Sequence, residues 1–108
     1  MTGRLRGLTV LNALIYFAAA TYHSGVLVPA GALAPASIAE ALLGLVLVGA
    51  LAGFLPPRVA YIIVLTGTVF GLAIVVARRL LGVDLWIHIV MLVGLSLAFV
   101  LVFARRRV

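Results

Sequence analysis

The chain of 108 residues contains no cysteine, no lysine and only two acidic residues, Glu40 and Asp84. Without cysteine, disulfides, cysteine-ligated metals and thiol exchange through a cysteine pair are excluded within the chain. Without lysine, the net charge of +6 comes from arginine alone. These arginines flank apolar runs, a pattern that orients membrane proteins and differs from the basic patch of a nucleic-acid-binding domain. We therefore expect no nucleic-acid partner.

Catalytic motifs are also missing. The sequence has no Ser/His/Asp arrangement, no phosphate-binding loop and no paired carboxylates, so soluble-type hydrolysis and phosphoryl transfer find no support. The composition favours a protein without catalytic activity of its own.

Apolar residues dominate what is present. The chain is 67% hydrophobic, with a mean hydropathy of +1.41, which lies outside the range of soluble globular domains. Four apolar runs cover about residues 8–28, 36–55, 60–77 and 85–104, and each can cross a hydrocarbon core of roughly 30 Å as an α-helix. The first run resembles a signal peptide but is longer and carries polar residues, so we expect it to be retained. The sequence predicts one domain over residues 1–108, an all-α integral membrane bundle of four transmembrane helices.

The connections and flanks predict the orientation of these helices. Residues 29–35 form a proline-bounded linker, and Pro56-Pro57-Arg58 forms a tight turn. Six arginines would lie on the side of the N-terminus, and two, Arg78 and Arg79, on the other side. The positive-inside rule then places both termini in the cytoplasm. We expect the protein in the plasma (inner) membrane of a prokaryote.

Three ionisable residues are expected at similar depth near the outer side. A carboxylate in hydrocarbon costs a few kcal/mol, so Glu40 calls for a partner or a function. By helical rise, His23, Glu40 and His88 each lie about 6 to 9 Å below the outer edge of their helices. The supporting residues predicted for this pocket are Tyr16, Ser37, Arg78, Arg79 and Asp84.

Helical spacing predicts that each helix turns a polar stripe inward. The stripes are Asn12, Tyr16 and His23 in the first helix, Ser37, Glu40 and Gly44 in the second, Tyr61, Thr68 and Arg79 in the third, and Asp84, His88, Met91 and Leu95 in the fourth. Gly44, Gly67 and Gly71 are predicted to allow close helix packing or dimer contacts. Tyr22, Tyr61 and Trp86 are predicted to be anchors at the membrane interface.

The pocket allows several interpretations. Two imidazoles and a carboxylate can ligate a divalent metal, and His23 with His88 could be the axial ligands of a haem. Glu40 with a histidine relay could handle protons or ions. Alternatively, Glu40 pairs with a histidine or an arginine and sets the helix register. The cofactor is therefore unknown, with haem or a divalent metal as the candidates.

Glu40, Gly44, Gly49 and Arg58 mark a helix that opens with a glutamate, continues through Gly and Leu, and turns at a basic residue. In this respect residues 38–75 resemble the DoxX-like family of small four-helix membrane proteins. The resemblance implies an accessory component of a membrane oxidoreductase or quinone-linked system, with no catalytic residues to transfer. The chain is also similar in size to the small multidrug resistance transporters, whose functional glutamate lies in the first helix.

The predicted function is thus that of an accessory or structural subunit of a membrane redox or respiratory complex. A haem- or metal-binding membrane protein and a small proton-coupled transporter are the alternatives. The partners expected are the lipid bilayer and either another protein or further copies of the chain.

Overall fold

A computed structural model describes residues 2–23, 34–77 and 82–104, and these form four helices without any strand. The helices are α1 (Gly3–His23), α2 (Ala34–Leu51), α3 (Pro57–Ala77) and α4 (Val83–Ala104). The prediction of an all-helical chain with four helices is confirmed.

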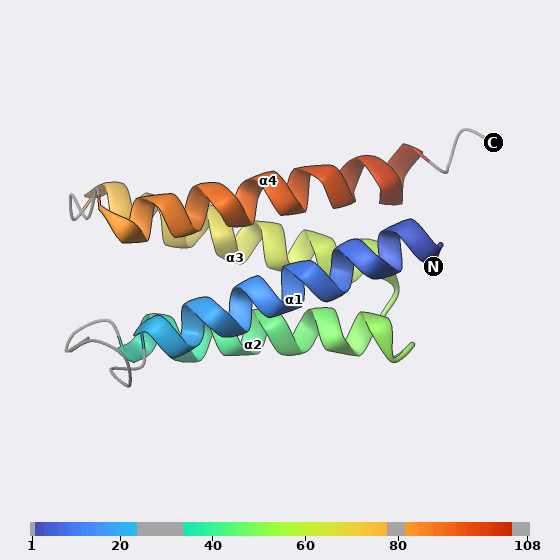
Figure 1. Ribbon diagram of the computed structural model, residues 1–108, viewed down its shortest axis with the longest axis horizontal. Helices are drawn as coiled ribbons and strands as arrows, with labels where there is room; N and C mark the ends of the chain where they lie inside the picture. The colour runs from blue at the N-terminus through green and yellow to red at the C-terminus, as the bar shows by residue number, and fades with distance from the viewer. Residues whose placement is uncertain (1, 24–33, 78–81, 105–108) are drawn as a thin grey trace.

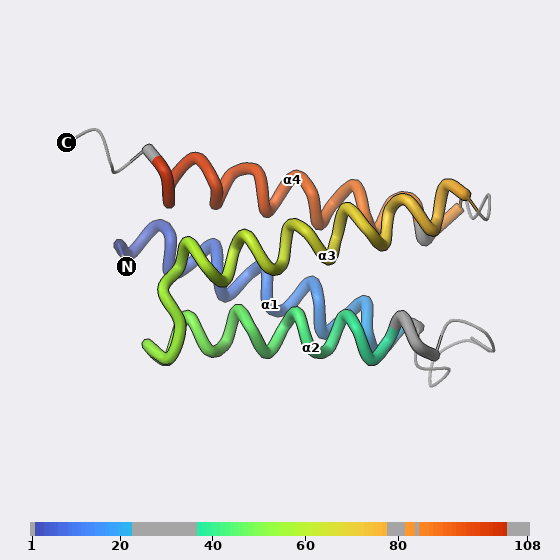
Figure 2. The backbone as a smooth tube through the Cα atoms, turned by 180° about the vertical axis from the view of Figure 1, so that it is seen from behind, coloured from blue at the N-terminus to red at the C-terminus, as the bar shows by residue number. Residues whose placement is uncertain are grey.

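The helices form an up-down-up-down bundle in which sequence neighbours are antiparallel (Figure 1). The chain starts, turns from α2 into α3 and finishes α4 at one end of the bundle, which we call the terminal end; the opposite end is the distal end (Figures 1 and 2). The helix pairs that pack most extensively are α1–α2, α2–α3, α3–α4 and α1–α4. The two parallel helices α1 and α3 therefore lie across the bundle from each other.

The first helix begins at Gly3, well before the predicted residue 8. Thr2 caps it, because its Oγ1 accepts a hydrogen bond from the Leu5 N–H at 3.2 Å. Leu5 is buried against the core. Hydropathy marked where the apolar run begins, whereas the cap and the burial of Leu5 decide where the helix begins.

The second helix ends in a Schellman motif, before the predicted residue 55. The Phe54 N–H donates to the Gly49 carbonyl at 2.9 Å, and the Gly53 N–H donates to the Ala50 carbonyl at 3.2 Å. Gly53 has a φ of +87°, which a residue without Cβ adopts easily. Pro57 then opens α3 at the position where its missing N–H costs no hydrogen bond.

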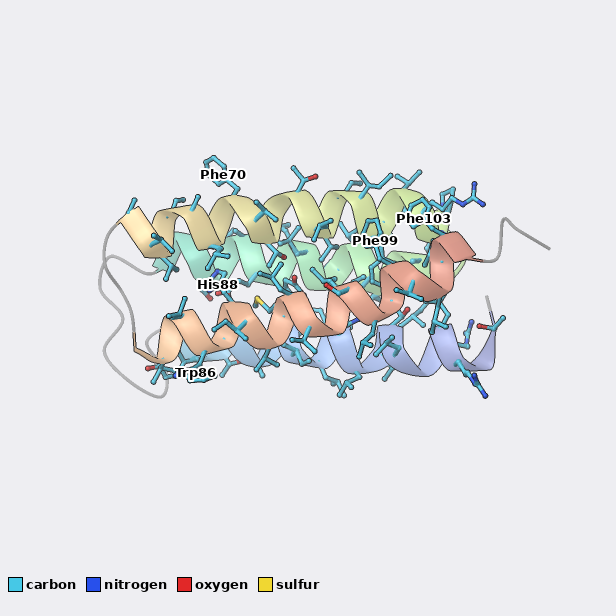
Figure 3. All side chains as sticks on the ribbon, turned by 90° about the horizontal axis from the view of Figure 1, so that it is seen from above. Phe70, Trp86, His88, Phe99 and Phe103 are labelled. Atoms are coloured by element: carbon cyan, nitrogen blue, oxygen red, sulfur yellow. The ribbon has the colours of Figure 1, made fainter. Side chains whose placement is uncertain are left out.

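The distribution of polarity is inverted relative to a water-soluble domain. Large apolar side chains are exposed on all four helices, including Leu14, Leu45, Phe70 and Leu97. Figure 3 shows Phe70 pointing away from the bundle, while His88 and Phe99 point between helices. The buried polar and charged residues described are Thr9, Asn12, Glu40, Thr68 and His88.

Two of the described helical stretches, Pro57–Ala77 and Leu85–Phe103, are long and apolar enough to cross a membrane. The apolar stretch of α2, Ser37–Leu51, is shorter. The composition of the described residues thus supports two membrane-crossing helices, not the four predicted.

Candidate functional site

The predicted pocket is described only in part. Glu40 and His88 are 6% and 8% exposed, so both ionisable side chains lie inside the bundle. The side chains of His23 and Asp84, together with Arg78 and Arg79, lie outside the described residues. Among the side chains described, no three His, Cys, Asp or Glu residues come together as metal ligands. The predicted metal set depends on His23 and so stays a prediction.

The described part of the pocket takes one polar side chain from each helix, and we call Tyr16, Glu40, Thr68 and His88 the distal cluster. The hydroxyls of Tyr16 and Thr68 are hydrogen-bonded across the bundle. Glu40 is close enough to Tyr16 for the two groups to interact electrostatically. His88 lies over Gly71, with Nε2 3.0 Å from the point where a Cβ would stand.

The direction of the Tyr16–Thr68 hydrogen bond follows from the other bond that Thr68 makes. Thr68 donates its hydroxyl proton to the Val64 carbonyl at 2.7 Å. A hydroxyl has one proton and two lone pairs, so Tyr16 must be the donor to Thr68. The Tyr16 oxygen can then still accept a hydrogen bond from another member of the distal cluster.

The other supporting residue, Ser37, joins α2 to α1 above the distal cluster. Its Oγ donates to the Ala20 carbonyl at 2.6 Å. Ala20 lies in the last turn of α1, where the helix's own N–H groups leave the carbonyls without partners, so this bond both caps α1 and ties it to α2 near the distal end. Ser37 therefore positions the start of α2, three residues before Glu40.

The predicted packing glycines each face a side chain of another helix. A Cβ on Gly44 would stand 2.9 Å from the Phe17 ring, and one on Gly67 would stand 3.0 Å from Leu43 Cδ1. Gly71 lies beneath His88. All three glycines thus serve close approach within the chain, and the Gly67/Gly71 motif is used inside the bundle.

A second polar cluster, which we call the terminal cluster, lies nearer the terminal end and consists of Thr9, Asn12, Tyr61 and Gly94. The hydroxyls of Thr9 and Tyr61 are 2.7 Å apart. Asn12 Nδ2 donates to the Tyr61 hydroxyl at 3.3 Å and to the Gly94 carbonyl at 3.2 Å. The Thr9 hydroxyl donates a hydrogen bond to the Leu5 carbonyl at 2.7 Å, so in the bond between the two hydroxyls Tyr61 is the donor to Thr9.

The terminal cluster corrects the prediction that Tyr61 is an interfacial anchor. Tyr61 is 0% exposed, and its hydroxyl bonds two residues of α1 instead of water or lipid headgroups. The helical spacing of Tyr61 and Thr68 did indicate an inward face. Tyr61 was misassigned because an aromatic residue near a helix end fits an interfacial anchor equally well.

Gly94 and Thr9 are the members of the terminal cluster that the sequence did not indicate, and Gly94 makes the closer contact with Asn12. Asn12 Oδ1 is buried with no hydrogen-bond donor among the described residues. It lies so close to Gly94 that a Cβ on Gly94 would overlap it. The contact is a Cα–H to oxygen approach, which recurs at helix interfaces. A lone glycine in an apolar helix carries no signal of this contact, because the partner is 82 positions away.

An apolar layer separates the two clusters along the bundle axis. Ala13, Val64 and Met91 are buried in the hydrophobic core, and each lies between cluster residues on its own helix. From the remaining helix, α2, Leu47 belongs to the same core. The interior therefore alternates between polar, apolar and polar layers.

Replacing Tyr61 by phenylalanine should lower the free energy of unfolding by about 0.6 kcal/mol and by no more than about 1.7 kcal/mol, the average and the maximum found for hydrogen bonds between membrane helices. The ring keeps its edge-to-face contact with Phe99, so only the hydroxyl is lost. Denaturation of the detergent-solubilised protein by SDS, followed by circular dichroism, gives the value. A Thr66→Val variant is the control, because the exposed Thr66 bonds only its own helix, at the Ile62 carbonyl. Equal stability of Tyr61→Phe and wild type would contradict the bonding in the terminal cluster.

Comparison with known protein families, with curated proteins and with solved structures finds no match to this chain. The resemblance of residues 38–75 to the DoxX-like family therefore stays a prediction. The geometry of the bundle is what supports the function proposed below.

Proposed function

We propose that this chain is an integral membrane protein whose four helices all span the bilayer, with both termini in the cytoplasm. We further propose that it acts as an accessory or structural subunit of a membrane complex. The observation that carries the proposal is the inverted polarity of the bundle: large apolar side chains cover its outside, and polar side chains pair inside it.

The polar content of α1 is compatible with a membrane span because of where it lies. Thr9, Asn12 and Tyr16 lower the hydropathy of the helix, but all three are buried in the bundle. The side chains that α1 exposes include Val10, Leu11 and Leu14. Hydrocarbon around the bundle would therefore meet an apolar surface, while the polar groups of α1 find their partners in α3 and α4.

The length of α2 is also sufficient in context. Its 18 residues extend about 27 Å at the rise of an α-helix, close to the roughly 30 Å of a hydrocarbon core. Glu40, the one charged residue within the apolar stretch Ser37–Leu51, is buried. A helix whose one charged group faces the bundle interior follows the usual rule for ionisable residues in membranes.

The charge at the terminal end supports the orientation. Arg4 and Arg6 are exposed at the start of α1, and Arg58 lies at the start of α3 over the ring of Phe103, 5.8 Å from its centroid. A guanidinium placed over an aromatic ring is held by a cation–π interaction, and an arginine near the end of an apolar helix can keep its charge at the membrane boundary in this way. With the arginines after residue 104, this end would face the cytoplasm.

Replacing Leu97 by arginine tests the apolar surface. Leu97 is exposed on α4, seven residues and about 10 Å before the end of the helix. A charge there would cost up to about 2.5 to 3.5 kcal/mol in a bilayer, the figure for a helix centre on insertion scales, whereas on a water-facing surface the cost is usually within about 0.5 kcal/mol. We expect the variant to be lost from carbonate-washed membranes, while Leu97→Ala is retained. A stable, water-soluble Leu97→Arg protein would contradict the membrane assignment.

Orientation can be measured with single cysteines, since the chain has none of its own. Thr2→Cys and Phe54→Cys should react with a membrane-impermeant maleimide only after the cells are permeabilised. Gly82→Cys, at an exposed position of the distal end immediately before α4, should react in intact cells. The reverse labelling pattern would show the opposite orientation, and labelling of all three sites in intact cells would contradict a four-span topology.

The accessory role is supported by what the interior polar groups do. Tyr16, Thr68, Thr9, Asn12 and Tyr61 bond one another across the bundle, as expected of side chains that set helix register. Purification in mild detergent from native membranes should yield one larger membrane protein in fixed stoichiometry with this chain. The abundance of that partner complex should fall when the chain is deleted.

The result that would contradict the accessory role is a chain that purifies alone and carries a stoichiometric metal or a Soret absorption band. Loss of that signal in His23→Ala and His88→Ala, with retention in a Thr66→Val control, would identify the cofactor-binding alternative. The absorption spectrum and metal content are measured on the same purified sample, so the two functions are separated in one preparation.

A further inference from the structure

An apolar groove of about 390 Å³ lies between α1 and α4. Ile15, Ala18, Ala19 and Tyr22 line it from α1, and Trp86 and Val90 are among the residues that line it from α4. α1 and α4 are antiparallel neighbours in contact, and the small side chains of Ala18 and Ala19 leave space between them. The groove is thus a depression in the apolar outer surface of the bundle.

The groove has a defined depth relative to the ends of the helices. Its lining on α1 extends from Ile15 to Tyr22, about 10 Å along the helix axis at 1.5 Å per residue. Tyr22 is one residue from the distal end of α1. The groove therefore starts near the distal boundary and ends before the middle of a bilayer whose core is roughly 30 Å thick.

The two ends of the groove differ in chemistry. Tyr22 and Trp86 stand at the distal end, and both are residue types that place a polar group at headgroup level and a ring in the hydrocarbon. Toward the middle of the bundle the lining is aliphatic, with Ile15 and Val90. A molecule with a polar head and one linear hydrocarbon chain matches this polarity.

We propose that the groove holds one acyl chain of an outer-leaflet phospholipid, with the headgroup beside Tyr22 and Trp86. The inference rests on the proposed membrane function, because the groove is continuous with the exposed apolar surface of α1 and α4, including Leu14 and Val93. In a bilayer, lipid hydrocarbon surrounds that surface. An apolar groove that opens toward the hydrocarbon would be filled by a lipid acyl chain. The depth of the groove matches a chain from the leaflet on the distal side.

The chain carries its own reporter of occupancy, since Trp86 is its only tryptophan and lines the groove. The experiment reconstitutes the full chain in phosphatidylcholine vesicles that contain increasing fractions of a lipid brominated on its acyl chains. Bromine quenches tryptophan on contact. A chain held in the groove stays in contact with Trp86, so at each brominated fraction the quenching should exceed that expected for a tryptophan that meets only freely exchanging lipid.

Two substitutions provide the comparison. Ala18→Phe fills the groove and should abolish the excess quenching, leaving the curve for random lipid contact. Ala39→Phe makes the same change at an exposed position of α2, outside the groove, and should leave the excess intact. Circular dichroism of both variants shows whether the helices are retained.

Wild-type quenching that already follows random contact and does not change in Ala18→Phe would overturn the proposed site. Protection of Trp86 from brominated lipid that grows with the protein-to-lipid ratio would also overturn it, because a second copy would then cover the groove. A failure of the membrane proposal looks different. In that case Trp86 would be quenched by aqueous iodide and not by brominated chains at any fraction.

Discussion

Gly94→Ala is expected to lower the free energy of unfolding by about 3 kcal/mol, since it combines overpacking with the loss of buried hydrogen bonds. A Cβ at this position would overlap Asn12 Oδ1. Asn12 cannot simply rotate away, because it is fully buried and its Nδ2 is bonded to Gly94 and Tyr61. Moving it would break the bonds that join α1 to both α3 and α4.

The control for Gly94→Ala is Gly7→Ala, which makes the same chemical change in an exposed part of α1. Nothing lies within 4 Å of a Cβ at Gly7. Alanine is the better helix former by about 0.8 to 1 kcal/mol, so this variant should be as stable as wild type or more stable. Both are measured by SDS denaturation in detergent, with circular dichroism as the readout.

A double-mutant cycle identifies Asn12 as the cause. In an Asn12→Ala background the side chain that meets the new methyl group is absent, so Gly94→Ala should then cost much less than in wild type. The difference is the coupling energy between the two positions. An unchanged cost in the Asn12→Ala background would show that Gly94 is constrained by something other than Asn12.

Leu47→Ala is expected to destabilise the bundle by about 2 to 5 kcal/mol, the range for truncating a fully buried leucine. Leu47 is 0% exposed and belongs to the hydrophobic core of the bundle. The substitution removes buried methyl groups and leaves a cavity, because the surrounding helices relax only partially into the space.

Leu45→Ala is the matched control on the same helix. Leu45 is 57% exposed, so its truncation removes little packing and should change stability by about 0.5 kcal/mol or less. The same SDS denaturation applies to both variants. Similar losses at positions 45 and 47 would contradict the rotation of α2 in the bundle, including the inward placement of Glu40 on the same helix.

The two predictions test different layers of one interior. Gly94 and Asn12 set the distance between α1 and α4 in the terminal cluster, whereas Leu47 fills the apolar layer next to it. The groove that we assign to a lipid chain lies farther along the same pair of helices, where Ala18 and Ala19 keep the side chains small. The Gly94 contact holds α1 and α4 together at a point from which they can diverge toward the distal end.

Local sequence properties determined the helical elements and much of their inward faces. Apolar runs bounded by prolines and arginines predict four helices, because helix formation depends on neighbours along the chain. The period of 3.6 residues likewise places Asn12, Tyr16, Glu40, Thr68 and His88 on inward faces, and all five are buried. The ends of the helices were less predictable, since the Thr2 cap and the left-handed Gly53 act within a few residues and hydropathy averages over many.

Only the tertiary structure decided which residues meet. Thr9 with Tyr61 and Tyr16 with Thr68 are each 52 positions apart, and Asn12 meets Gly94 across 82 positions. Such pairs depend on how whole helices are rotated and shifted along their axes relative to one another. A short stretch of sequence does not determine either quantity. For the same reason the sequence indicated Glu40 and His88 as a pocket but missed the terminal cluster: a charge in an apolar run stands out locally, whereas a glycine or a tyrosine acquires its role from the helix packed against it.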